Sequence, residues 1–128
     1  MLIEGRWHRL GTPVVYCTDH PSTALLEILV HATRQTVPDF YQLIEIEAPD
    51  DVSVEYLDTD IQSTDIEATR ELGSTFLEAR RHALLRIPSI IMPKAYNFVL
   101  NPKHSDAAGI FISNLYRYPF DSRLLEGT

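Results

Sequence analysis

The chain has 128 residues, of which 45% are hydrophobic and 23% are charged, and its formal net charge is −7 at pH 7. This length and composition predict one soluble globular domain with a hydrophobic core. The acidic balance disfavours direct nucleic-acid binding, because neutralising phosphates requires clustered Lys and Arg.

Three further features of the composition narrow the class of protein. The single cysteine, Cys17, excludes an intrachain disulfide and favours a reducing, cytoplasmic location. No apolar run approaches membrane-spanning length, so no membrane association is expected. The five histidines are scattered without the spacing of zinc ligands, and no metal site is predicted.

The first predicted elements are a strand and a helix. Residues 14–17 form a short β-prone run after a Gly-Thr-Pro turn. Pro21 suits the first turn of a helix, which the apolar periodicity extends to about Thr33. Most faces of this helix are apolar, and its polar side chains share one narrow stripe at i, i+4 and i+8: Thr23, Glu27 and His31.

The middle of the chain predicts two strands and two helices. Residues 43–47 and 52–56 alternate apolar with polar side chains, and residues 48–51 form the turn between them. A capping box at residues 64–67 opens a helix that should stop near Gly73. A second capping box at residues 75–78 opens another helix, which continues to about His82.

The last third of the chain is rich in β-prone residues. In the run 84–93, Pro88 cannot donate to a central ladder, which predicts a bulge or a sheet edge at Ser89. Residues 97–100, 109–112 and 116–118 are further predicted strands. The whole pattern predicts an α+β single domain, with a mixed, mostly antiparallel sheet core and flanking helices.

Four side chains are candidates for chemistry, although no simple catalytic motif is present: Arg6, Tyr16, Glu27 and Ser89. Each has an ordinary structural interpretation when it is considered alone. Arg6 could be an exposed charge, and Tyr16 could belong to a strand core. Glu27 could face water on the polar stripe, and Ser89 could satisfy its own hydrogen bonds in a bulge. From the spacing of these residues alone, the ordinary structural interpretation is favoured at each of the four positions.

Ordered segments along essentially the whole chain resemble the RES-domain family, which is named for an arginine, a glutamate and a serine. Three segments of this chain resemble the opening motifs of the family: GRWH (residues 5–8), GTPVVY (11–16) and ALLE (24–27). One segment, LRIPSIIMP (85–93), resembles the serine motif. Two segments resemble the closing motifs: NFVLNPKH (97–104) and FDSRL (120–124).

The resemblance implies a bacterial type II toxin with a fold similar to the ADP-ribosyltransferase toxins and with NAD as its substrate. Arg6 would hold the pyrophosphate through paired charge-assisted hydrogen bonds. Tyr16 would stack on or bond near the nicotinamide, and Ser89 would fix the carboxamide or the adjoining ribose. Glu27 would bind the ribose hydroxyls and stabilise the cation that forms as nicotinamide leaves. No metal or other cofactor is required, because nicotinamide is already a cationic leaving group.

The resemblance also bears on partners and on domain limits. It implies a cognate antitoxin with a helix-turn-helix region that blocks the cleft, and it leaves open a homodimer within the toxin–antitoxin complex. Residues 1–128 are expected to form one RES domain whose upstream family segment is missing. Three functions follow as alternatives: cleavage of NAD by hydrolysis or phosphorolysis, protein ADP-ribosylation, or an inactive remnant that only binds the antitoxin.

Overall fold

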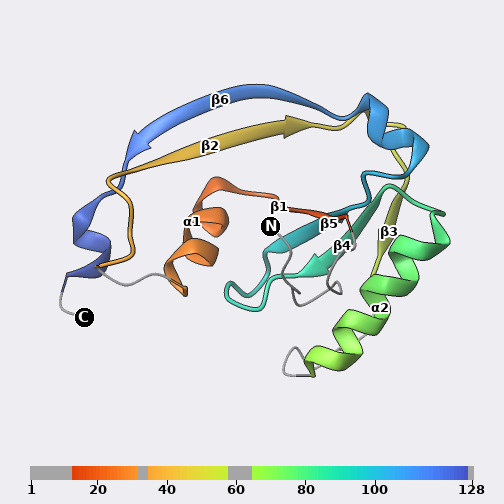
Figure 1. Ribbon diagram of the computed structural model, residues 1–128, viewed down its shortest axis with the longest axis horizontal. Helices are drawn as coiled ribbons and strands as arrows, with labels where there is room; N and C mark the ends of the chain where they lie inside the picture. The colour runs from red at the N-terminus through yellow and green to blue at the C-terminus, as the bar shows by residue number, and fades with distance from the viewer. Residues whose placement is uncertain (1–12, 32–34, 58–64, 127–128) are drawn as a thin grey trace.

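The computed structural model describes residues 13–31, 35–57 and 65–126, which form an α+β domain (Figure 1). Two α-helices, six strands and two short 3-10 helices lie within these residues. In chain order they are β1 (Val15–Thr18), α1 (Pro21–Leu29), β2 (Phe40–Glu47), β3 (Val54–Tyr56), α2 (Ile66–Ala79), β4 (Leu84–Pro88), β5 (Tyr96–Leu100), η1 (Ser105–Gly109), β6 (Phe111–Pro119) and η2 (Ser122–Leu125). The predicted fold class is confirmed.

The strands form two separate sheets. A four-stranded sheet has the order β1-β5-β4-β3, in which only the β3–β4 pair is parallel. The long strands β2 and β6 pair antiparallel as a two-stranded ribbon, with a bulge between Glu45 and Ile46. In Figure 1 this ribbon runs along the top of the view, above α1 and the four-stranded sheet. Helix α2 lies at the lower right, on the side of the four-stranded sheet away from the ribbon.

The hydrophobic core lies between α2 and one face of the four-stranded sheet. Phe76 and Leu77 of α2 are 5% exposed, and they pack with the buried side chains of Leu85, Ile87 and Val99. Leu85 and Ile87 alternate along β4, so both project from the same face of the sheet. Burial of this apolar surface is the main stabilising contribution to the domain.

The middle of the chain forms one helix, α2, where the sequence predicts two. Its buried positions are Thr69, Gly73, Phe76 and Leu77, which follow helical spacing and form a single continuous face. The burial of this face outweighs the weak helix propensity of Gly73, which costs about 1 kcal/mol relative to alanine. The predicted stop near Gly73 is therefore wrong.

The ends of α2 also differ from the prediction. The N-cap is Asp65, whose side chain accepts from the backbone N–H of Ala68 at 3.0 Å. The predicted cap, Thr64, lies outside the described residues. The helix ends at Ala79, before His82, because Arg80 adopts a left-handed conformation with φ of 52°.

No bulge forms at Ser89, and the predicted sheet edge is present only locally, at the end of an internal strand. Strand β4 lies inside its sheet, between β5 and β3, and ends at Pro88. The N–H of Ser89 donates to the carbonyl of Ala95 on the β5 side, at 2.9 Å. Because successive N–H groups point in opposite directions along a strand, the nitrogen of Pro88 faces the β3 side, where the ladder stops at Arg86. Proline is thus accommodated where no ladder bond is required.

Three smaller differences concern the limits of the elements. Helix α1 ends at Leu29, short of the predicted Thr33. The segments 109–112 and 116–118 are not two strands, because one strand, β6, runs from Phe111 to Pro119 and η1 precedes it. The predicted strands around 43–47 and 52–56 exist as β2 and β3, but they belong to different sheets.

Candidate active site

Helix α1 turns its polar stripe towards the protein. Thr23 is 4% exposed and Glu27 is half-buried, whereas His31, just beyond the helix, is exposed. By contrast, the apolar side chain of Ile28, next to Glu27 on the helix, is 44% exposed. An inward-facing carboxylate requires hydrogen-bond donors, because burying an unpaired charge is costly. The interpretation of Glu27 as a solvated residue is therefore wrong.

The carboxylate of Glu27 receives donors from two other elements. Ser89, directly after β4, donates its hydroxyl to Glu27 Oε1 at 3.3 Å. Asn97, on β5, donates Nδ2–H to the same oxygen at 2.9 Å. The register pairs Thr18 with Asn97 and Pro88 with Tyr96. The site thus lies at one end of the strands of the four-stranded sheet, where β1 and β4 end and β5 begins.

The hydroxyl of Ser89 is held in a fixed orientation. Its oxygen accepts the backbone N–H of Ile91 at 3.3 Å and of Met92 at 3.1 Å. A serine hydroxyl has two acceptor positions and one donor hydrogen. Because both acceptor positions are used, the hydrogen points to Glu27. Ser89 is 8% exposed, so this arrangement is largely shielded from water.

The two remaining predicted residues, Tyr16 and Arg6, are placed differently. Tyr16 lies on β1 opposite Val99, which puts it on the same sheet face as Asn97, two residues from Val99 along β5. Its side chain is 43% exposed. Arg6 lies outside the described residues. The structure therefore brings Glu27 and Ser89 together and places Tyr16 at the adjoining strand.

A cavity of about 670 Å³ lies between the four-stranded sheet and β2. Tyr16 and Cys17 of β1 line it, together with mostly apolar side chains such as Phe98 of β5 and Ile46 of β2. Burial raises the pKa of the Cys17 thiol, which keeps this side chain neutral and suits an apolar wall. A volume of this size is within the range of small-molecule sites.

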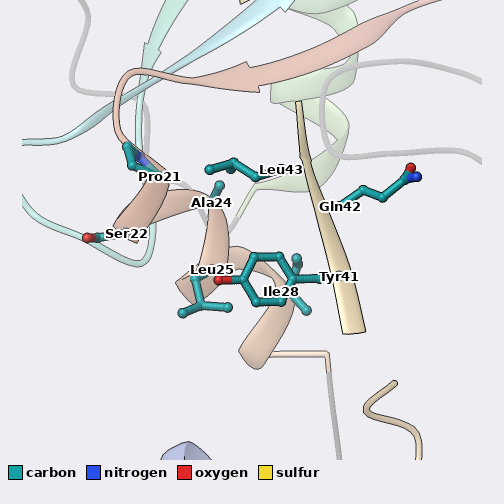
Figure 2. A pocket seen from close by; sticks show the side chains of 8 residues that line it. All are labelled: Pro21, Ser22, Ala24, Leu25, Ile28, Tyr41, Gln42 and Leu43. Atoms are coloured by element: carbon teal, nitrogen blue, oxygen red, sulfur yellow. The ribbon is translucent and has the colours of Figure 1, made fainter. Parts of the chain in front are cut away.

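A smaller groove of about 210 Å³ separates α1 from β2. Figure 2 shows the ring of Tyr41 beside Leu25 and Ile28, with Gln42 pointing away from them. Ala24 lines both this groove and the larger cavity. The apolar face of α1 is thus covered only in part by the ribbon, which explains the exposure of Ile28.

The described residues also bear on metal binding and on membrane insertion. In residues 13–31, 35–57 and 65–126, no three His, Cys, Asp or Glu side chains are grouped so that they could hold a metal ion. Over the same residues, neither helix has the length and apolar character needed to cross a bilayer.

Asn97 is the site residue that the sequence reasoning missed. Strand β5 alternates its side chains, so Asn97 shares a face with the fully buried Val99. A polar residue that projects from the same face of a strand as a buried residue indicates a hydrogen-bond partner inside the protein.

Comparison with known proteins identifies the family of the chain. A family model described as the RES domain matches residues 2–121, which include Glu27, Ser89 and Asn97. The chain belongs to the RES-domain family.

Curated relatives of this RES domain are toxins. Toxin Res from Pseudomonas putida is 40% identical over 127 residues, which cover 95% of this chain and 86% of the relative. Toxin Res from Photorhabdus laumondii is 35% identical and covers 98% of this chain and 84% of its own length. The Prs ADP-ribosylating toxin from Sphingobium sp. (strain YBL2) is 33% identical, over 94% of this chain and 80% of the relative.

Proposed function

We propose that this RES-domain protein is a toxin that cleaves the nicotinamide–ribose bond of NAD. The observation that carries the proposal is the half-buried carboxylate of Glu27, held by Ser89 Oγ and Asn97 Nδ2 where the strands end. A carboxylate fixed in this way provides a preorganised negative charge for a cation that develops in the transition state. A relative named for ADP-ribosylation supports chemistry at this bond.

The reaction breaks the bond between C1′ of the ribose and the nicotinamide nitrogen. The bonding electron pair leaves with nicotinamide, which becomes neutral, and positive charge develops on the ribose. Water then attacks C1′ and releases a proton, giving ADP-ribose, or phosphate attacks and gives the corresponding ribosyl phosphate. Neither route requires a metal ion or a redox cofactor to balance.

Glu27 is the catalytic residue in this proposal. Among the residues that the structure describes, both hydrogen bonds to its carboxylate end on Oε1. Oε2 is therefore available to accept a ribose hydroxyl, and the negative charge stabilises the adjacent cation. Ser89 holds the carboxylate, since its hydrogen is directed to Glu27 and its lone pairs are occupied by the loop.

The remaining roles are assigned from the resemblance and from residue chemistry. Tyr16 lies on the sheet face that carries Asn97, and it is proposed to contact the nicotinamide. Arg6 is proposed to hold the pyrophosphate, because a guanidinium forms paired hydrogen bonds with phosphate oxygens. A cognate antitoxin with a helix-turn-helix region is the proposed partner, and it would block the site.

Purified protein incubated with NAD tests this function. Chromatography should show loss of NAD and release of nicotinamide in equal amounts, and parallel reactions with and without phosphate identify the attacking nucleophile. Glu27→Gln should abolish the reaction, whereas the matched change Glu78→Gln, at an exposed position of α2, should not. Intact NAD with both the parent and Glu27→Gln proteins contradicts the proposal and favours an inactive protein that only binds an antitoxin.

Protein ADP-ribosylation is the second candidate, because one relative is named for that activity. It uses the same bond cleavage but delivers ADP-ribose to a protein side chain in place of water or phosphate. Incubation with labelled NAD and a cell lysate separates the two. A labelled protein that depends on Glu27, with little free ADP-ribose, would assign transfer as the main reaction.

A further inference from the structure

Asn97 occupies an unusual place on β5. Its side chain is half-buried, and it projects from the same sheet face as the buried core residue Val99. Among the described residues, the only hydrogen-bond partner of its side chain is Glu27, which is 70 residues earlier in the chain. From this arrangement we infer that Asn97 is a positioning residue that orients the Glu27 carboxylate, an inference that rests on the proposed function of Glu27.

The orientation of the Asn97 amide is determined by Glu27. A carboxylate only accepts hydrogen bonds, so the nitrogen of the amide must face it. The 2.9 Å bond from Nδ2 is shorter than the 3.3 Å bond from Ser89 Oγ to the same oxygen. Hydrogen bonds to a charged acceptor are stronger than hydrogen bonds to a neutral one. Both donors here bind the same carboxylate oxygen, so the shorter distance decides between them. Asn97 is therefore the stronger of the two groups that fix Oε1.

The other end of the Asn97 amide carries a cost to the fold. Oδ1 is buried, and within the described part of the chain it has no hydrogen-bond partner. A buried acceptor without a partner destabilises a protein, and such groups in native structures call for a functional explanation. A β-branched apolar residue would suit this strand position better for stability alone. The fold therefore retains an amide here for its contact with Glu27.

Asn101, just after β5, provides an internal comparison. Its Nδ2 donates to the carbonyl of Leu77 at 3.0 Å, and its Oδ1 accepts from the N–H of Lys103 at 3.1 Å. Asn101 is 1% exposed, so both ends of a fully buried amide are satisfied. Its contacts join β5 to the core helix α2 and do not involve Glu27. Asn101 is thus a structural asparagine on the same stretch of chain.

The experiment makes the same substitution at both asparagines and measures NAD cleavage and thermal unfolding. Asn97→Val should lower kcat about 10- to 100-fold, the loss typical of one hydrogen bond to a charged group, with KM changed less than about threefold. Its Tm should fall less than that of Asn101→Val, because Glu27 keeps the Ser89 donor and the unpartnered Asn97 Oδ1 is removed. Asn101→Val should lower Tm by about 4 °C or more and leave kcat per folded molecule within about twofold. Failure of Asn101→Val to fold would agree with its structural role.

A third variant separates donation from shape. Asn97→Asp keeps the size of the side chain but replaces the donor with an oxygen, and it places a second carboxylate against Glu27. It should lower kcat at least as much as Asn97→Val. An unchanged kcat in either Asn97 variant, or a loss of Tm in Asn97→Val as large as that in Asn101→Val, would overturn the inference.

A readout without NAD keeps the two proposals distinguishable. The side-chain amide resonances of Asn97 can be identified by NMR, because they disappear in Asn97→Val. They should shift in Glu27→Gln and stay in place in Glu78→Gln. If the parent protein does not consume NAD, the proposed function fails, whereas a shift in Glu27→Gln still supports the contact that positions Glu27. Amide resonances that do not respond to Glu27→Gln would overturn the positioning role.

Discussion

Glu27 and Ser89 are 62 residues apart in the chain, and a 3.3 Å hydrogen bond joins their side chains. Glu27 comes from a helix whose polar stripe faces inward, and Ser89 comes from the loop that follows an internal strand. The glutamate and the serine that the sequence resemblance singled out thus meet where strands β1 and β4 end.

Ser89→Ala should reduce NAD cleavage by about tenfold, through loss of one donor to a carboxylate. The substitution also removes the acceptor for the backbone N–H groups of Ile91 and Met92, so the loop should become less ordered. Steady-state kinetics measures the first effect and amide hydrogen exchange in the loop measures the second. Ser105→Ala, at an exposed position of η1, is the matched control and should change neither. Full activity in Ser89→Ala would argue that Asn97 alone positions Glu27.

Local patterns were sufficient to predict some elements but not how they meet. The strand at residues 14–17, the helix that begins at Pro21 and the strand at 97–100 were predicted because their signals lie within the segments themselves. The periodicity of α1 also placed Thr23 and Glu27 on one stripe. It could not show that this stripe faces inward, because the groups that stabilise a buried Glu27 come from distant Ser89 and Asn97.

Errors in the sequence prediction arose where tertiary contacts override local propensity. Gly73 indicates a helix end in isolation, but burial against the core keeps α2 continuous. Pro88 indicates an edge strand, but β4 is internal and only its end lacks a neighbour, because the β3 ladder stops at Arg86. The pairing of β2 with β6 joins segments about 70 residues apart, and no local signal encodes it. Asn97 was missed because its partner, Glu27, lies 70 residues earlier in the chain, although its alternation with Val99 indicates an internal hydrogen bond.

Arg86→Met should destabilise the protein by about 1 kcal/mol through loss of cation–π contacts. The guanidinium carbon lies 4.4 Å from the ring centroid of Tyr56 and 4.2 Å from that of Tyr96, so Arg86 links β3, β4 and β5 on one face of the sheet. Urea unfolding measures the difference. Arg86→Lys keeps a cation between the rings and should recover part of the loss, whereas equal loss in both variants would show that the rings contribute little.

Ala24→Leu should stabilise the protein by about 1 kcal/mol, because it buries additional apolar surface in a groove that is only partly filled. Ala24 lines the 210 Å³ groove beside Leu25 and Tyr41 (Figure 2). The free energy of unfolding from urea titration measures the gain. The control is Ala79→Leu, the same change at an exposed position of α2, which should alter stability by less than about 0.5 kcal/mol. A loss of stability in Ala24→Leu would mean that α1 and β2 cannot move apart to accept the larger side chain.

Asp106 should make stability depend on pH in the acid range. Its carboxylate accepts from the backbone N–H of Ser53 at 3.0 Å and from the Ser53 hydroxyl at 2.9 Å, and it ties η1 to the segment before β3. The backbone hydrogen bond, then the hydroxyl, hold the pKa of Asp106 below its ordinary value of 3.8.

The sign of the effect follows from this lowered pKa. A group that binds its proton less tightly when folded stabilises the fold above its unfolded pKa, and the contribution is lost as pH falls through the folded pKa. The parent protein should therefore be more stable than Asp106→Asn at pH 7, and the gap should close progressively below about pH 4, as the carboxyl is protonated in both states. Thermal unfolding of both proteins between pH 7 and pH 2.5 measures this gap. A gap of constant size across that range would show that the charge of Asp106 contributes nothing to the tie with Ser53.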